Sequence, residues 1–93
     1  MKTLPEDVAV YKQTAEFTED TIPPGLLRGH TTKAGTWGHI VVLEGRLRYR
    51  ILEPEVEEHV LDLDHHGVVE PQVPHEVAPL GPVRFRVDFL RAG

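Results

Sequence analysis

Two segments of the chain alternate between hydrophobic and polar residues with a period of two. In residues 46–52, Leu47, Tyr49 and Ile51 alternate with three arginines. Successive side chains of a β-strand point to opposite faces, so the hydrophobic residues share one face and the arginines the other. Residues 83–90 repeat this pattern, with a hydrophobic face made of Val83, Phe85, Val87 and Phe89. Each segment therefore predicts a strand with one buried and one solvated face.

Shorter strands are predicted along the rest of the chain. Eight glycines and eight prolines interrupt it about every ten residues, which is typical of short strands joined by turns. No window favours an amphipathic helix, and we interpret residues 56–63 as a strand because they alternate and contain the β-branched Val60. We expect a hairpin turn at Glu44-Gly45 and strands at residues 8–12, 26–30, 38–43, 46–52, 57–63, 67–69, 75–79 and 83–90. The predicted fold class is all-β.

The length of the chain limits its domain organisation. Its 93 residues leave room for one domain, residues 1–93. Residues 1–22 are less regular than the rest, and we expect them to form an edge strand or an arm onto a partner. A chain this short buries only about 60–65% of the surface that its unfolded form exposes. We therefore expect it to bury more by forming a homodimer.

The net charge of −5 argues against nucleic acid as a partner, because phosphate binding depends on clustered positive charge. The arginine face of residues 46–50 is a local exception. We interpret it as a solvated strand face paired with the acids of residues 53–58, and an anion site is the alternative.

Other partners are limited by composition as well. The chain has no cysteine, so any metal must be held by His, Asp or Glu. Its longest hydrophobic runs are far shorter than a membrane span, and no hydrophobic signal segment follows Met1. We expect a cytoplasmic protein with no membrane partner.

Six histidines are the main candidates for chemistry. His30 ends a predicted strand, His39 begins the next one, and His75 follows Pro71-Gln72-Val73-Pro74. If Gly38 and Ile40 face the interior, alternation places His39 outside, unless a bulge at Gly38 reverses it. His75 is either a ligand or a loop histidine bonded to the backbone. We expect the three histidines of the acidic segment to face solvent: His59, His65 and His66.

Two further residues have open interpretations. Asp88 lies on the polar face of residues 83–90, so it is either solvated there or lines a polar end of the fold. In the second case Arg28 or Lys33 would neutralise it, because a buried carboxylate without a partner is costly. Trp37, which lies between small residues, is either a pocket wall or a large core residue.

Several of these pieces together resemble a known family. His30, the glycine of Glu44-Gly45 and the pair Pro74-His75 are arranged as in cupins. More closely, residues 27–45, Glu70-Pro71 to His75 and Val87-Asp88-Phe89 resemble the small cupin-like family of the TehB N-terminal domain and YeaR-like proteins. The resemblance runs from about residue 4 to residue 91. It implies a single-domain cupin-type β-barrel, that is, a double-stranded β-helix or jelly-roll.

The resemblance also implies a site. Cupins hold a metal with three histidines and a glutamate, and here His30 and His75 match, whereas the glutamate position falls at about Gly38. The resemblance makes His39 the first candidate for a third ligand of Zn, Ni, Fe or Mn, with Asp88 and Glu44 after it, since open metal sites commonly have three protein ligands. No other cofactor is implied. The expected ligand pocket is lined by Arg28, Lys33, Trp37 and Asp88.

Three functions follow as hypotheses. The first is a small cupin-like protein that binds a divalent metal or a small ligand in a tellurite, oxyanion or nitrosative stress response. The second is a metal-dependent cupin enzyme of the dioxygenase or isomerase type, whose catalytic residues the sequence does not name. The third is a ligand-free dimerisation module. We do not expect a methyltransferase, because no glycine-rich nucleotide-binding loop follows a predicted strand.

Overall fold

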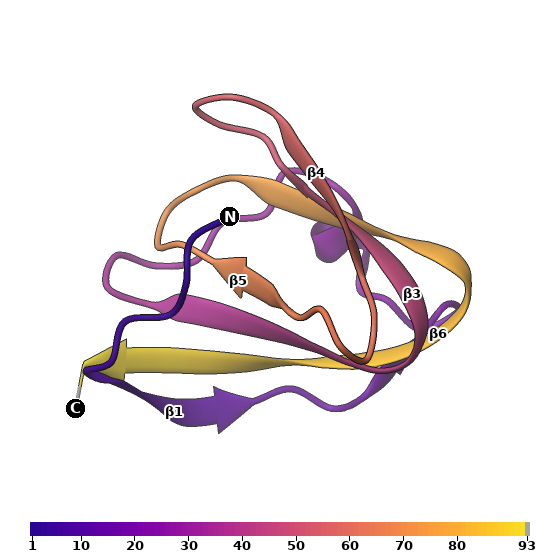
Figure 1. The fold of residues 1–93 in the computed structure, drawn as a ribbon, viewed down its shortest axis with the longest axis horizontal. Coiled ribbons are helices and arrows are strands. Elements are labelled where there is room, and N and C mark those ends of the chain that lie inside the picture. Colours follow the sequence, from indigo (N-terminus) through magenta and orange to yellow (C-terminus); the bar gives the residue numbers. More distant parts are fainter. Residues whose placement is uncertain (93) are drawn as a thin grey trace.

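Two long strands, β3 (Trp37–Ile51) and β6 (His75–Ala92), pair along almost their whole length. The computed structural model describes residues 1–92. The pairing of β3 with β6 is antiparallel and runs from Trp37 opposite Leu90 to Ile51 opposite His75. In Figure 1 both strands run to one end of the molecule and turn back there together. Their two halves therefore face each other as two layers.

The short strands extend these two layers. β1 (Val8–Gln13) and β2 (Phe17–Thr18) pair with the second half of β6, and β5 (Gly67–Val69) pairs with the beginning of β3. β4 (Glu57–Leu61) pairs with the end of β3. The strand order is β1-β6-β3-β4, so within residues 1–92 the six-stranded sheet is open, with β1 and β4 at its two edges. The all-β class and the single domain are confirmed; closure into a barrel is not.

The predicted hairpin at Glu44-Gly45 is wrong. β3 continues through these residues without a chain reversal, and Gly45 lies opposite Val83 of β6. The pairing shifts register on both sides of Gly45, which marks bulges where the strands bend. Gly45 has a φ of 75°, and a Cβ there would lie 2.0 Å from the carbonyl oxygen of Pro82. The glycine permits a bend with close backbone contact, not a chain reversal.

Two other predicted elements also differ from the structure. Residues 75–79 and 83–90 belong to one strand, β6, because the chain bends at Gly81 without leaving the sheet. Residues 26–30 are not a strand: Pro24–Leu27 form a short 3₁₀ turn, η1, with proline in its first turn. Proline is compatible with the first turn of a helix because its fixed φ fits there and its missing N–H is not needed.

The alternating residues form the core as predicted. Leu47, Tyr49 and Ile51 are buried on β3, and so are Val83, Phe85 and Val87 on β6. Before the bulges the β3 residues of the central core cluster are even-numbered, Ile40 and Val42, and after them odd-numbered. The bulges therefore keep hydrophobic side chains inside on both halves of the strand.

The arginine face of β3 lies outside the core, as the alternation predicts. Arg48 and Arg50 form ion pairs with Glu58 on β4, at 3.8 and 3.6 Å. Arg50 also pairs with Glu76 on β6, at 3.3 Å. The interpretation as a face paired with acids is confirmed for Glu58.

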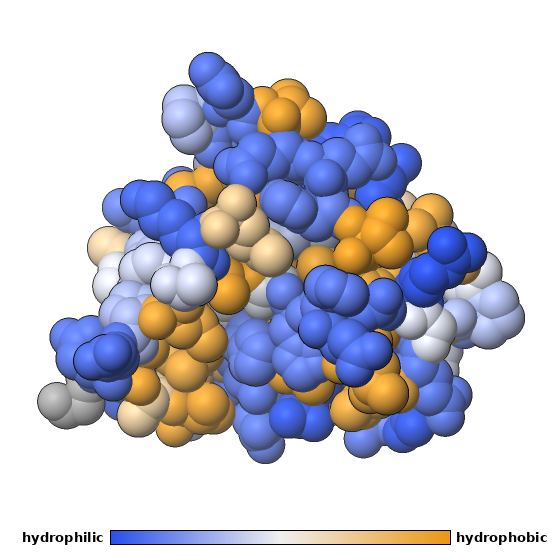
Figure 2. Space-filling view, viewed as in Figure 1, coloured by the Kyte–Doolittle hydropathy of each residue, from blue (hydrophilic) through white to orange (hydrophobic). Residues whose placement is uncertain are grey.

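Hydrophobic side chains on the surface are scattered. Val10 and Tyr11 on β1 are exposed, as are Val56, Val60 and Leu63 around β4. Figure 2 shows separate hydrophobic patches among mostly polar side chains on this face.

The homodimer stays a prediction. None of the helices in residues 1–92 is long and hydrophobic enough to cross a membrane.

Replacing Gly45 by alanine is expected to destabilise the protein by about 3 kcal/mol or more, because the new methyl group collides with backbone and φ is positive. The free energy of unfolding, measured by denaturant titration, checks this. Gly25→Ala is the matched control, because a Cβ there meets nothing within 4 Å. Equal stability of the two variants would contradict the role assigned to Gly45.

Candidate functional site

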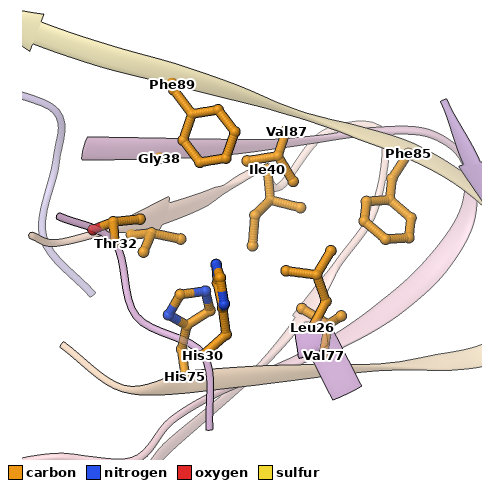
Figure 3. A pocket seen from close by; sticks show the side chains of 11 residues that line it. Leu26, His30, Thr32, Gly38, Ile40, His75, Val77, Phe85, Val87 and Phe89 are labelled. Carbon is orange, nitrogen blue, oxygen red and sulfur yellow. The ribbon is translucent and has the colours of Figure 1, made fainter. Parts of the chain in front are cut away.

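A small cavity lies between the two layers. It offers about 20 Å³ to the centre of a water molecule, which is room for one water. Hydrophobic side chains form most of its wall, and three polar residues, His30, Thr32 and His75, form one corner (Figure 3). The full lining is Leu26, His30, Thr32, Gly38, Ile40, Val69, His75, Val77, Phe85, Val87 and Phe89.

His30 and His75 are brought together by a short piece of backbone pairing. Each residue donates its backbone N–H to the carbonyl of the other, at 2.8 and 2.9 Å, in a single antiparallel bridge. Their ring centres are 5.5 Å apart and the ring planes are nearly perpendicular. In Figure 3 both rings project from one layer toward Ile40 and Phe89 of the other. Residues forty-five positions apart in the chain thus share one corner of the cavity.

His75 is held in one tautomer. Its side chain is only 4% exposed, and its Nδ1 lies 3.1 Å from the carbonyl oxygen of Val73. A carbonyl can only accept, so Nδ1 carries the proton and Nε2 is left with a lone pair. Burial lowers the pKa of His75, and the nearby His30 lowers it further, against the raising effect of the Val73 carbonyl. His75 is therefore neutral at pH 7 and offers a hydrogen-bond acceptor.

Two surface clefts adjoin the cavity, and His30 and Phe89 line all three spaces. The first, which we call the polar cleft, has a volume of about 320 Å³ and is lined by Tyr11, Lys12, His30, Thr31, Thr32, Lys33, Thr36 and Phe89. The second, the apolar cleft, has about 220 Å³ and is lined by Thr14, Phe17, Pro23, Gly25, Leu26, His30, Val87 and Phe89. His30 and Phe89 thus form the wall between the buried corner and the surface.

The structure places the predicted pocket residues in different parts of the molecule. Lys33 lines the polar cleft beside His30. Arg28 is exposed at the end of η1, and Trp37 begins β3 on the face opposite to Gly38. Neither of them lines the cavity or either cleft.

Asp88 also lies away from the cavity. Its neighbours Val87 and Phe89 face the cavity, so Asp88 faces the other side of the sheet. It is 4% exposed there and accepts a hydrogen bond from Nε of Arg86 at 3.0 Å. Arg86, and not Arg28 or Lys33, neutralises this buried carboxylate.

His39 is separated from His30 and His75. Gly38 and Ile40 line the cavity, so His39 points to the opposite face, as simple alternation predicts. There its Nε2 lies 3.1 Å from Nδ1 of His66. Burial lowers the pKa of His39, and His66 lowers it further. The expected set of three histidines is therefore not assembled.

The described part of the chain, residues 1–92, contains no group of three or more His, Asp or Glu side chains that could hold a metal. The contact between His66 and His39 was also not expected, because His66 was predicted to face solvent. Nothing in the local sequence indicates this contact, which depends on the pairing of β5 with β3.

Sequence reasoning missed several wall residues. Thr32 is buried, and its hydroxyl donates to the carbonyl of Thr36 at 2.8 Å. Leu26 lines both the cavity and the apolar cleft from η1. Phe89 was expected in the core, and the alternation placed it on the correct face. Its position beside His30 depends on how the two layers fold over each other.

Comparison with known proteins gives the chain a context. A family model described as the TehB-like domain matches residues 12–87. The probable S-adenosyl-L-methionine-dependent methyltransferase TehB of Haemophilus influenzae, strain Rd, is 36% identical over 78 residues, which cover 80% of this chain and 27% of TehB. TehB of H. influenzae strain 10810 matches with the same identity and coverage. The chain thus spans about a quarter of the length of these curated relatives.

Solved structures agree with the fold. The crystal structure of TehB from H. influenzae matches with a TM-score of 0.86 and 33% identity, covering 94% of this chain and 32% of that one. A crystal structure of a protein from Escherichia coli, strain K12, matches with a TM-score of 0.88 over 100% of this chain and 99% of that one. Its identity is 20%, so it supports the fold alone.

The buried, neutral state of His75 predicts a pH dependence of stability. Burial holds the pKa of His75 in the folded protein below the ordinary histidine value of about 6.5, so below about pH 6.5 the unfolded chain binds the proton more readily. Stability should then fall as pH falls from about 6.5 toward the folded pKa, by at most about 1.4 kcal/mol per pH unit from this group.

The measurement is denaturant unfolding between about pH 7.5 and 5. His75→Asn is the matched variant, because its amide can donate to the Val73 carbonyl but does not titrate. It should show a shallower loss of stability than the wild type. Identical slopes would mean that His75 does not stay neutral in the folded protein.

Proposed function

This chain belongs to the TehB-like domain family, and we propose that it acts as a small-molecule-binding domain whose site is centred on His30, His75 and Phe89. The observation that carries the proposal is the common wall: one buried corner and two surface clefts all border His30 and Phe89. A hydrophobic hollow with a few convergent polar groups is the usual form of a small-ligand site.

The polar corner supports recognition of a hydrogen-bond donor. Nε2 of the neutral His75 can accept a hydrogen bond, whereas its Nδ1 is already used by Val73. The apolar cleft would take the hydrophobic part of a ligand against Leu26 and Phe17. The cavity itself holds no more than about one water molecule. The body of the ligand therefore lies in the clefts, with only a small group directed to the corner.

A divalent metal bound by His30 and His75 is the second candidate. The adjacent imidazole rings favour it, since neutral imidazole is a common ligand of Zn, Ni and Fe. Open metal sites usually have three protein ligands, and His39 lies on the other face of the sheet. A metal here would need the bound ligand or water to complete its coordination, and the enzyme hypothesis depends on such a metal.

The relatives suggest a setting for this function. H. influenzae TehB is a probable S-adenosyl-L-methionine-dependent methyltransferase, and the matched region is 27% of it. We propose that the domain binds a small molecule in the stress-related setting of this family, such as a tellurite or other oxyanion response. We also propose that the folded-over sheet is a reduced cupin-type barrel and that the protein forms a homodimer.

A short neutral alcohol, 1-hexanol, is a direct probe of the site. We expect it to shift backbone amide resonances of residues around the apolar cleft, above all Leu26 and His30. Leu26→Trp should weaken binding about tenfold or more by filling the cleft. Leu27→Trp is the matched control, because Leu27 is exposed on the same 3₁₀ turn and lines none of the three spaces.

Absence of binding to the wild type, or equal weakening by both tryptophan variants, would overturn the proposal. The metal candidate is tested separately with Zn, Ni, Fe and Mn. It predicts a rise in melting temperature that His75→Ala and His30→Ala each abolish. No rise with any of the four ions would leave the small-molecule site without a metal.

A further inference from the structure

We propose that the ligand is an anion, whose negatively charged group binds in the polar cleft between Lys12 and Lys33 while a short hydrophobic body lies in the apolar cleft. This inference rests on the proposed function and specifies its ligand class. It concerns residues that the corner of His30 and His75 does not include. A carboxylate, a phosphate or another small oxyanion has the required chemistry.

The charge of the polar cleft favours the binding of an anion. Two of its eight wall residues are lysines, and none is acidic, although acids outnumber bases in the chain as a whole. Neither Lys12 nor Lys33 takes part in an ion pair among the described residues. Arg91 does not line the cleft, but its Cζ lies 4.2 Å from the ring centre of Tyr11, which does. The cleft therefore offers unpaired positive charge on a protein whose net charge is negative.

A local irregularity of β1 brings this charge into place. Val10 pairs with Leu90 and Lys12 with Phe89, so the register shifts at Tyr11. In a regular strand Tyr11 and Lys12 would point to opposite faces. The bulge lets both line the same cleft, in which Lys12 lies beside Phe89. Bulges often redirect side chains in this way at functional sites.

Hydroxyl groups complete the cleft. Thr31 lies on its wall and is exposed, and its hydroxyl can donate to an anion. The hydroxyls of Tyr11 and Thr36 lie 3.5 Å apart, too far for a strong hydrogen bond, so either can turn toward a ligand. Thr32 is already bonded to the Thr36 carbonyl and fixes the wall. The side chains of the cleft thus offer an anion two ammonium groups and three hydroxyl donors.

The shape of the site indicates that the ligand also has a hydrophobic part. The polar and apolar clefts meet at His30 and Phe89, and the accessible surface of the apolar cleft is hydrophobic. A molecule that spans both must be charged at one end and hydrophobic at the other. Each exposed lysine supplies a modest attraction, which salt weakens.

The test compares hexanoate with 1-hexanol, which differ mainly in charge, by following amide shifts in titrations of the full chain. In low salt, at about 0.01 M, we expect hexanoate to bind about five- to twentyfold more tightly than 1-hexanol. In about 1 M salt the ratio should fall toward one. Inorganic phosphate at the same concentrations separates an anion site without a hydrophobic part from the amphipathic site proposed here.

Charge variants locate the effect. The double variant Lys12→Gln with Lys33→Gln should lower the affinity for hexanoate to that for 1-hexanol and leave 1-hexanol binding unchanged. Lys33→Arg should retain the preference. Lys2→Gln is the control for a lost charge, because Lys2 pairs with Glu70 outside the cleft.

The outcomes separate the two proposals. If 1-hexanol binds at the apolar cleft but hexanoate binds no better, or if the double glutamine variant retains the preference, the anion site is wrong and the binding domain stands. If phosphate binds as well as hexanoate, the hydrophobic part of the ligand is wrong. If neither hexanoate nor 1-hexanol shifts any resonance, both proposals fall.

Discussion

The pairing of β3 with β6 is the interaction on which the other features of this protein depend. Both strands bend at the same place, and they stay paired on either side of the bend. This is possible because Gly45 allows the backbone of Pro82 to come close, and because the bulges change which residues of β3 face inward. A strand that bent without a bulge would turn Leu47 and Tyr49 toward solvent.

The same bend creates the site. It brings the end of β3 and the start of β6, where His75 lies, opposite the other halves of these strands, which carry Ile40 and Phe89. The His30 bridge then closes one side of the space between the layers. Tyr49 strengthens this arrangement, because its hydroxyl donates to the carbonyl of Val68 on β5 at 2.9 Å. The corner histidines are thus held by backbone on one layer and face side chains of the other.

Much of the fold was predictable, because alternation is a local property. It identified the core face of residues 46–52 and 83–90 and the outward position of His39. It did not distinguish a bend from a hairpin, since Gly45 suits both and only the partner strand decides between them. The meeting of His30 with His75 came from a family resemblance, and the positions of Leu26 and Lys12 depend on a 3₁₀ turn and a bulge that leave no clear pattern in the sequence.

The ring of Phe89 contacts all three spaces of the site. Its ring separates the cavity, which has room for about one water molecule, from the polar and apolar clefts, which are open to solvent. Whatever rests against one side of that ring limits how far it can swing toward the other. An occupant of either cleft would therefore hold the ring in place against the cavity, which has room for about one water molecule.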